Sequence, residues 1–470
     1  MLSKHAAHVE LEPTYQALEQ GRFEVAFTTL ETAASRPLEP ETQALYLLYL
    51  AEVYALQESK GIDDGFLALQ SAVSTDPRLA EHPLYKALFW EFSARRGKTA
   101  AEVKRGIEDA LEARDPLAQF HAAKALIIVK AKKSATRLLE RIEDLSLPTY
   151  LEWRRWSLLG GCYQQQGKWE SACTAFDRAV QASSGIEQQN QRLRLAGCLL
   201  ELGEPERVLR VLGDIDLASL SRHQEVTVFC LRGRAQLAMN NPNSALLLFQ
   251  HARAIELETE AGPSSFMLAF ALGQCLTTLG RFVEAAGALE DAVALAPHEL
   301  KPYAQHEYAF ALAESGDLQR AESSLEAILL HSSYIYRAQV FVDLAELALR
   351  QGDFKRAEDH GLRALELGAV AEACLCLGTI ALDTFSFEDA RGWFERAIHA
   401  CEEGEPYWTL GHQMLADLFA QQGQGSADRL LFHAQAALSY TPPESDWYLP
   451  LNHHRTVAMN YLGNCGRILN

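Results

Sequence analysis

Apolar residues recur along this chain at helical spacing, in pairs of short segments separated by a polar turn. The stretch 156–179 shows the pattern most clearly, with Trp156 and Leu159 on a first helix and Phe176 on a second. Gly167 stands in the turn between the two helices. Because one such pair cannot bury its apolar face alone, it predicts further pairs on either side of it.

The turn position of Gly167 recurs at an elastic period through the second half of the sequence. Successive separations of 36, 37, 40, 36, 36, 33 and 38 residues lead from Gly167 to Gly203, Asn240, Gly280, Gly316, Gly352, Phe385 and Gly423. Five residues after each of these markers stands a small or branched apolar residue, except after the last, where Asp428 breaks the pattern. A small residue here lets the second helix approach the first closely.

A large apolar residue follows four positions after each small one and is expected to fill the groove between the helices. These residues are Phe176, Leu212, Phe249, Leu289, Leu325, Phe394 and Phe432. Gly361 occupies the large position in one repeat, so a packing deficit or a compensating neighbour is expected there.

The pattern is looser before residue 150 and ends near residue 440. The run 126–129 lies between Ala-rich stretches, which favours a buried helix over a strand. Pro442 and Pro443 break the array, and a last helix with a polar outer side follows them. We therefore predict three parts: degenerate helical repeats with a locally basic segment in 1–150, a regular array in 151–440, and a C-terminal capping helix in 441–470.

The pattern resembles the tetratricopeptide repeat family, and in particular the arrays of bacterial regulatory and scaffold proteins. The resemblance is strong over 151–440 and rests on Trp156, Leu159, Gly160, Tyr163, Gly167, Ala172, Phe176 and Ala179. It implies an all-α fold, a right-handed superhelical α-solenoid of antiparallel helix pairs. It also implies that proteins or peptides bind in the concave groove, but it does not identify the partner, since one fold hosts many functions.

In proteins of this kind the first helix of each repeat lines the concave wall. The resemblance therefore implies a partner-binding set at the matching positions: Arg154, Gln164, Gln165, Asn190, Thr227, Arg234, Met267, Phe270, Gln274, Thr277, Tyr303, His306, Phe310, Glu314, Gln339, Glu346, Glu372, Thr379, Asp383, Gln413 and Asp417.

This set is polar and partly basic at its start, aromatic in the middle and acidic at its end. A segment with a central apolar anchor and a basic part would complement it, either as an amphipathic helix or as an extended peptide. The alternative is that Met267, Phe270 and Phe310 only pack against the next repeat. The Lys and Asn set with which some members of the family capture a C-terminal carboxylate is absent.

Charge narrows the class of partner. A net charge of −19 argues against direct nucleic-acid binding and against docking on anionic lipid, because both need a surplus of Lys and Arg. Residues 95–155 are the exception, with 14 Lys and Arg against 9 Asp and Glu. A basic patch is conceivable at Lys130, Lys132, Lys133, Arg137 and Arg141. A solvated helix face of mixed charge explains the same residues and is favoured.

Candidate chemistry is sparse. The nine cysteines are scattered among predicted helices, as buried thiols of a reducing compartment are. Cys374 and Cys376 point about 200° apart on a helix, so they cannot grip one ion together. No phosphate loop, nucleophile elbow or zinc-protease helix is present. We expect no enzyme activity, cofactor or metal, no membrane span, and a cytoplasmic location.

Two functional hypotheses follow. The first is a non-enzymatic scaffold that binds a protein or peptide in the concave groove. The second is a ligand- or peptide-controlled bacterial transcription-regulator module that acts with a DNA-binding partner, although no helix-turn-helix stands out in the chain. The sequence carries no signal for the oligomeric state.

Overall fold

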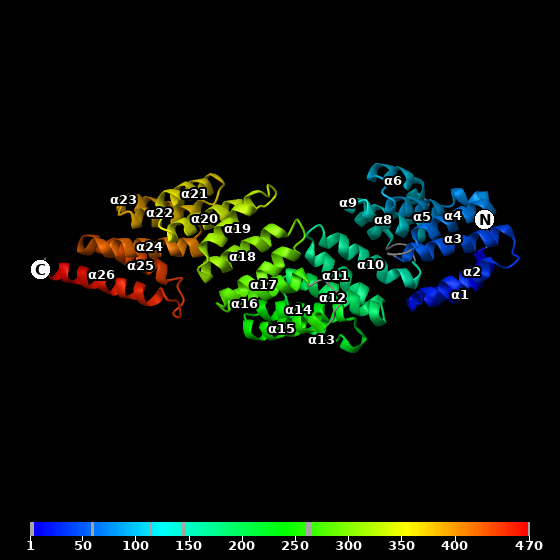
Figure 1. Cartoon of the computed structure of the whole chain (residues 1–470), viewed down its shortest axis with the longest axis horizontal. Helices are drawn as coiled ribbons and strands as arrows, with labels where there is room; N and C mark the ends of the chain where they lie inside the picture. Colours follow the sequence, from blue (N-terminus) through cyan, green and yellow to red (C-terminus); the bar gives the residue numbers. More distant parts are fainter. Residues whose placement is uncertain (1–3, 58–60, 113–114, 143–146, 259–264, 469–470) are drawn as a thin grey trace. The chain divides into compact units, whose positions relative to one another are not determined.

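The computed structural model describes residues 4–57, 61–112, 115–142, 147–258 and 265–468. The described residues form helices joined by turns, and no strand occurs among them (Figure 1). Contacts within the chain define two units, residues 1–260 (unit 1) and residues 261–470 (unit 2). The predicted all-α solenoid class is confirmed. The three-part division at residues 150 and 440 stays a prediction.

Unit 1 contains α1 (Lys4–Glu19), α2 (Phe23–Ala34), α3 (Pro40–Leu56), α4 (Ile62–Thr75), the 3₁₀ turn η1 (Pro77–Glu81), α5 (Pro83–Arg95), α6 (Ala100–Gly106), α7 (Glu108–Glu112), α8 (Pro116–Ile128), α9 (Lys132–Arg141), α10 (Thr149–Gln164), α11 (Trp169–Ala182), α12 (Gly185–Glu201), α13 (Pro205–Gly213), η3 (Leu217–Ser219), α14 (Arg222–Ala238) and α15 (Pro242–Glu258). Unit 2 contains α16 (Phe266–Thr278), α17 (Phe282–Leu295), α18 (Lys301–Ser315), α19 (Leu318–Leu329), α20 (Arg337–Arg350), α21 (Phe354–Glu366), α22 (Val370–Asp383), α23 (Phe387–His399), α24 (Pro406–Gln422), η4 (Gly423–Ser426), α25 (Ala427–Leu438) and α26 (Tyr448–Ile468).

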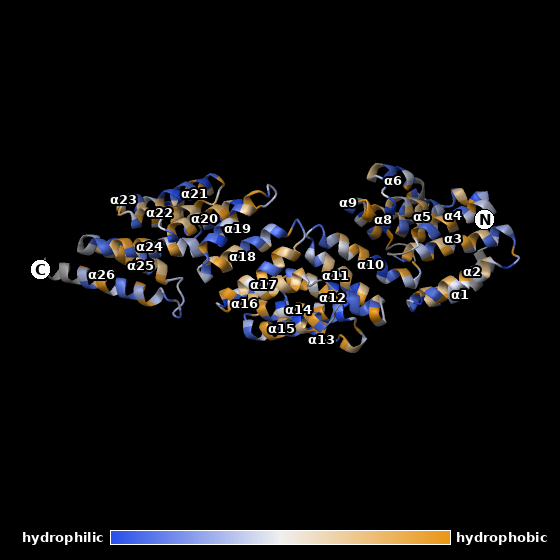
Figure 2. Ribbon diagram, viewed as in Figure 1, coloured by the Kyte–Doolittle hydropathy of each residue, from blue (hydrophilic) through white to orange (hydrophobic). Residues whose placement is uncertain are grey.

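Most helices pack mainly against the next one along the chain, as repeat architectures require, whereas α5 packs mainly against α8. Figure 2 shows that most helices carry both hydrophobic and hydrophilic residues, so that one side is available for packing. The closest approach within a repeat joins a small residue of the first helix to a large one of the second. A Cβ added to Gly160 would lie 2.8 Å from the Phe176 ring, and one on Gly378 would lie 2.4 Å from the Phe394 ring.

The marker positions share a left-handed backbone, which explains why glycine prevails there. Five markers are glycines with a positive φ, from 70° at Gly280 to 92° at Gly316; the others are Gly167, Gly203 and Gly352. Asn240 and Phe385 adopt φ of 58° and 61° at the same position without being glycine. The register predicted from the sequence therefore corresponds to a real structural feature, the residue that reverses the chain between the paired helices.

Replacing Phe385 by glycine is expected to raise the free energy of unfolding by up to about 1 kcal/mol. Phe385 is 78% exposed, and a left-handed backbone costs a residue with a Cβ roughly 1–2 kcal/mol, of which part is offset by the greater entropy of glycine in the unfolded chain. Urea unfolding followed by circular dichroism measures the change. Ser386→Gly in the same turn, where φ is −88°, is the control and should bring no gain. Equal shifts for both variants would contradict this explanation.

The register is wrong in the last repeat. Asp428 and Phe432, which the spacing placed at the packing positions, are both exposed, Phe432 to 62%. The turn η4 begins at Gly423, so α25 begins four residues after this marker, whereas α11 begins two residues after Gly167. Gly423 also has φ 78° with ψ −154°, outside the left-handed helical region. Consequently Leu430 and Ala434 of α25 are buried in place of the predicted pair.

Of the two alternatives expected at Gly361, the structure shows the compensating neighbour. A Cβ added to Gly361 on α21 would lie 2.9 Å from Leu377 Cδ2 on α22. Leu377 is 3% exposed, so a large residue of the next helix fills the space that the missing side chain leaves.

The weak region before residue 150 contains the same two-helix unit. The run 126–129 lies at the end of α8, as predicted, and Lys130 reverses the chain toward α9 with φ 60°. Ala135 and Leu139, five and nine residues after Lys130, are both 0% exposed. The repeat was not recognised in the sequence because lysine occupies the turn position that glycine usually marks.

A buried ionic cluster joins three helices of unit 1 and is bonded to a fourth. It consists of Glu52 on α3, Glu91 and Arg95 on α5, and His121 and Lys124 on α8. His121 Nδ1 lies 2.6 Å from Glu91 Oε2, and Lys124 Nζ lies 3.0 Å from Glu91 Oε1. The hydroxyl of Tyr150 on α10 donates to Glu52 Oε1 at 2.6 Å. These contacts tie α10 to helices that precede it by up to about a hundred residues.

Candidate partner-binding site

The first helices of the repeats in unit 2 line a hollow of about 620 Å³, here called the aromatic hollow. Six of the predicted wall residues take part in it, namely Phe270, Gln274, Tyr303, His306, Phe310 and Gln339. The remaining lining residues are Phe266, Leu300, Glu307, Tyr334, Tyr336 and Asp343. The wall positions that the resemblance implied are thus brought together over α16, α18 and α20.

Tyrosine rings form one side of the aromatic hollow. The ring centroid of Tyr303 lies 5.0 Å from that of Tyr334 and 6.2 Å from that of Tyr336, in both cases edge to face. Tyr334 is 5% exposed, whereas Tyr336 is 53% exposed. Tyr334 and Tyr336 come from the connection between α19 and α20, which the helical pattern did not assign to the wall. The cluster offers an apolar surface with the geometry that aromatic side chains prefer.

A hydrogen-bonded chain runs through the aromatic hollow and ends on a carboxylate. His306 lies between Tyr334 and Asp343, with its Nδ1 2.7 Å from the Tyr334 hydroxyl and its Nε2 against Asp343 Oδ2. Gln339 Nε2 donates to the other oxygen, Asp343 Oδ1, at 3.0 Å. Burial raises the pKa of Tyr334, so its hydroxyl stays protonated and can donate to His306. These bonds fix Asp343 at the border of the hollow.

A second hollow of about 330 Å³ adjoins the first and shares Gln339 with it. Predicted wall residues Glu346, Glu372 and Thr379 line this acidic hollow, together with the cation Arg350. Arg350 is paired with Glu314 at 2.6 Å. Partial desolvation on the wall, with the nearby carboxylates of Asp343 and Glu314, raises the pKa of Glu346. Closely spaced carboxylates of this kind favour a cationic partner group.

Other predicted wall residues of unit 2 lie outside both hollows. Met267 is 45% exposed, Gln413 is buried against Thr441, and Asp417 is bonded to His454 at 2.8 Å. Thr277, Glu314 and Asp383 also line neither hollow. Phe310, in contrast, is 50% exposed within the aromatic hollow. The exposure of Met267 and Phe310 disfavours the alternative that they are packed away against the next repeat.

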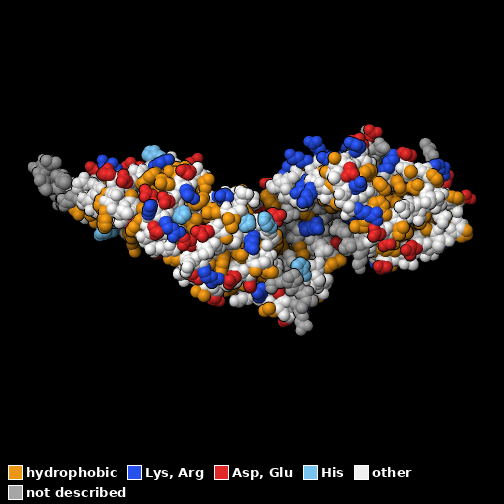
Figure 3. All heavy atoms as spheres, turned by 45° about the horizontal axis from the view of Figure 1, so that its top comes forward, with side chains coloured by type: hydrophobic (Ala, Val, Ile, Leu, Met, Phe, Trp, Pro, Cys, Tyr) orange, Lys and Arg blue, Asp and Glu red, His pale blue; other side chains and the backbone are white. Residues whose placement is uncertain are grey.

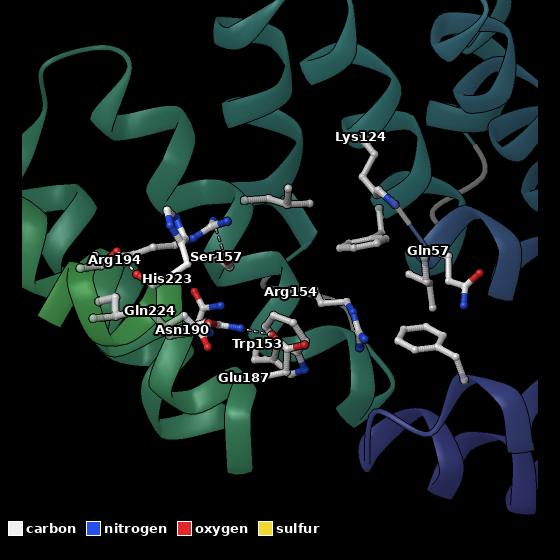
Figure 4. A pocket seen from close by; sticks show the side chains of 17 residues that line it. Gln57, Lys124, Trp153, Arg154, Ser157, Glu187, Asn190, Arg194, His223 and Gln224 are labelled. Atoms are coloured by element: carbon white, nitrogen blue, oxygen red, sulfur yellow. Dashed lines mark hydrogen bonds between the residues drawn. The ribbon is translucent and has the colours of Figure 1, made fainter. Parts of the chain in front are cut away.

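Unit 1 carries a separate hollow of about 810 Å³, shown in Figure 4. Of the predicted wall residues, Arg154, Asn190 and Thr227 line it. The exposed residues Gln164 and Gln165 lie at the end of α10 beyond it, and Arg234 is paired with Glu201 at 3.3 Å.

Sequence reasoning missed most of the residues that line the hollow of unit 1. They are Phe23, Leu56, Gln57, Phe120, Lys124, Trp153, Ser157, Leu158, Glu187, Gln191, Leu193, Arg194, His223 and Gln224. Arg194 and His223 stand one helical turn from the predicted Asn190 and Thr227, so the i, i+4 rule could have found them. The lining residues on α2, α3 and α8 are distant in sequence from the predicted wall residues, so no local sequence pattern predicts them.

The predicted basic patch lies apart from this hollow. Lys130, Lys133, Arg137 and Arg141 are exposed on or beside α9, and Lys132 is half-buried. Figure 3 shows Lys and Arg side chains gathered on one side of unit 1. The opposite face of α9 is buried, so the helix is amphipathic and its cations face solvent, as a functional patch and a merely solvated face both require. A function for the patch stays a prediction.

Seven of the described thiols are buried, as predicted, and Cys401 after the end of α23 is the exception. Cys162, Cys173, Cys198, Cys230, Cys275, Cys374 and Cys376 are buried and Cys401 is half-buried, while the side chain of Cys465 lies outside the described residues. Within the described ranges, no group of three or more His, Cys, Asp and Glu side chains is placed to hold a metal ion. No helix in this part of the chain has both the length and the apolar character needed to cross a bilayer.

Repeated antiparallel helix pairs with hollows on their first helices define a helical-repeat protein of the interaction-scaffold class. Residues 230–299, 309–372 and 342–405 match the model of the tetratricopeptide repeat family, so this part of the chain consists of tetratricopeptide repeats. No curated protein matches the sequence.

Several solved structures are similar to the chain at low sequence identity. The apo form of the quorum sensor NprR from B. thuringiensis is 13% identical, covers 66% of this chain and 97% of its own, and has a TM-score of 0.47. The APC/C hetero-tetramer Cut9–Hcn1 is 12% identical over 97% of both chains, with a TM-score of 0.41. The pilF protein of Pseudomonas aeruginosa is 17% identical over 49% of this chain and 98% of its own, with a TM-score of 0.37. Likeness at this level does not extend to function.

Proposed function

We propose that unit 2 is a protein-binding module whose groove, made of the aromatic hollow and the acidic hollow, binds one segment of a partner protein. The segment places an aromatic or aliphatic side chain in the aromatic hollow and Arg or Lys side chains against the carboxylates of the acidic hollow. The observation that carries the proposal is the adjoining pair of hollows, one aromatic and one acidic, which meet at Gln339.

Three features support the assignment of an apolar side chain to the aromatic hollow and of basic side chains to the acidic hollow. Exposed rings such as Phe310 and Tyr336 gain most when an apolar side chain covers them. Glu346 and Glu372 have no cation among the described residues in ion-pair contact, so a partner's cation would compensate them. Desolvation and, after it, the carboxylates of Asp343 and Glu314 raise the pKa of Glu346, and a bound cation would lower that pKa again.

The test uses a labelled peptide with a central Leu-Phe pair followed by Arg and Lys residues, here called the anchor-basic peptide. The double substitution Glu346→Lys with Glu372→Lys is expected to weaken its binding about tenfold or more, because attraction becomes repulsion. Fluorescence anisotropy measures the affinity. Thermal unfolding should stay unchanged, since Glu346 is exposed and Glu372 half-buried on the wall.

The matched control is Glu358→Lys with Glu366→Lys, which changes net charge equally at exposed positions of α21 outside both hollows. Two further peptides carry Ser in place of the Leu-Phe pair, or Glu in place of the basic residues. Equal binding by both double variants, or by all three peptides, would show that the groove of unit 2 is not the site.

A further inference from the structure

The hollow of unit 1 has a charge opposite to that of the chain as a whole. The protein carries a net charge of −19, yet Arg154 and Arg194 line this hollow against the single carboxylate of Glu187, while Lys124, also in the lining, is paired with Glu91. Figure 4 shows these side chains on the walls, with Lys124 and Arg154 on one side and Arg194 and Glu187 on the other. A local surplus of cations in a concave wall attracts anionic groups more strongly than the same residues on a convex surface.

Arg194 is the cation most open to a ligand. It is exposed, its Nη1 donates to Ser157 Oγ at 3.0 Å, and no carboxylate in the described part of the chain is in ion-pair contact with it. A guanidinium has five N–H donors in a fixed fork that matches a carboxylate. The nearby Glu187 already accepts from Asn190 Nδ2 at 3.3 Å. Arg194 can therefore receive an external carboxylate in bidentate fashion.

Amide side chains flank Arg194 on two helices. Gln224 Nε2 on α14 donates to Asn190 Oδ1 on α12 at 2.5 Å, which holds the two amides in a row. Gln191 is only 2% exposed, and its Oε1 has no hydrogen-bond partner among the described residues. A buried acceptor without a partner costs stability, so its presence in the lining indicates a bond that is made only when a ligand is bound.

We propose that the hollow of unit 1 binds an acidic segment of a partner protein, with Asp or Glu carboxylates toward Arg194 and Arg154 and with polypeptide N–H groups toward the amide row. This second site requires the opposite charge from the groove of unit 2, so the inference is independent of the function proposed above. One chain would thereby bring together an acidic and a basic segment.

A protein segment fits the hollow better than a nucleic acid does. The guanidinium of Arg154 lies 4.4 Å from the ring centroid of Trp153, so this face of the ring is not available for stacking on a base. The cations of the lining are also too few for a phosphate backbone, and the net charge of the chain repels a long polyanion.

The probe is a fluorescein-labelled decapeptide of alternating Glu and Ala, with a decapeptide of alternating Lys and Ala as its counterpart. Arg194→Glu is expected to weaken binding of the acidic peptide about tenfold, and binding should weaken further as salt is added. Arg210→Glu is the matched control, because Arg210 is exposed on α13 outside the hollow. Anisotropy titrations of the full chain measure all affinities.

A second variant separates binding from folding. Gln191→Met removes the unpaired acceptor at similar volume, so we expect a higher unfolding temperature together with severalfold weaker binding of the acidic peptide. A merely structural glutamine would give lower stability and unchanged binding, which would overturn its assigned role. The proposal as a whole fails if Arg194→Glu and Arg210→Glu bind equally, if the basic decapeptide binds as well as the acidic one, or if oligothymidylate binds more tightly than the acidic peptide.

Discussion

Replacing Phe394 by alanine is expected to lower the free energy of unfolding of unit 2 by about 3–5 kcal/mol, the range for a fully buried aromatic residue. Phe394 is 0% exposed and fills the space that Gly378 leaves on the facing helix. The same applies to Phe176 and Gly160 in unit 1. Neighbouring helices cannot collapse into the cavity without breaking the next interface of the array, so little of the loss is recovered. Urea unfolding measured by circular dichroism gives the change.

Phe432→Ala is the matched control for this prediction. Phe432 belongs to the following helix pair but is 62% exposed, so its truncation should cost less than about 1 kcal/mol. A result in which Phe394→Ala and Phe432→Ala cost the same would contradict the description of the packing positions. It would also restore the register that the spacing alone had assigned to the last repeat.

Removing the Glu91 carboxylate is expected to cost about 3–5 kcal/mol in unit 1, because it leaves buried cations without their counter-charge. Glu91 is 0% exposed and contacts Arg95, His121 and Lys124 at once. Glu91→Gln keeps the shape of the side chain and removes only the charge. Thermal and urea unfolding of this variant measure the cost, with Glu206→Gln as control at an exposed position of the same unit. Similar losses in both variants would contradict a special role for the cluster.

The same cluster sets a pH dependence with two limits. Burial by itself raises the pKa of Glu91, but Lys124, His121 and Arg95 outweigh it and hold this pKa at about 2. Its contribution to stability is therefore present above the ordinary carboxyl pKa and is lost as the pH falls toward 2. Burial by itself lowers the pKa of His121, but Glu91 and Glu52 outweigh the effect of burial, so the pKa of His121 is raised overall.

The stabilisation from protonated His121 is thus complete below the ordinary imidazole pKa of about 6.5 and is lost as the pH rises through the elevated value. Unfolding of wild type and His121→Gln across this range tests the sign. The stability difference between them should shrink as the pH rises. A difference that grows with pH would contradict the proposed charge state.

Helix pairing could be predicted from the sequence because each repeat is a local unit. The small residue, the large residue and the turn marker all lie within about a dozen positions, and a shared left-handed backbone at Gly167, Asn240 and Phe385 underlies the spacing. The register failed where the connection itself changed, at η4, since a longer turn shifts every later position. Lys130 concealed one repeat because a non-glycine residue adopts the left-handed turn there.

The candidate sites could be predicted only in part. Tyr303, His306 and Glu346 follow from their place on first helices, and the structure puts them in hollows. Tyr334 and Tyr336 lie in a connection whose path the helical period does not determine. The bond from Tyr150 to Glu52 likewise joins residues whose proximity depends on how successive helix pairs stack, which no local pattern encodes.

The most direct test of the account is photo-crosslinking of the anchor-basic peptide to unit 2 of the full chain. A benzophenone amino acid at position 310 replaces a half-exposed ring of the aromatic hollow, and the same group at position 330 replaces an 86% exposed leucine outside both hollows. We expect a crosslink from position 310 that unlabelled peptide abolishes, and none from position 330. Equal crosslinking from both positions, or crosslinking from position 330 alone, would contradict binding in the groove of unit 2.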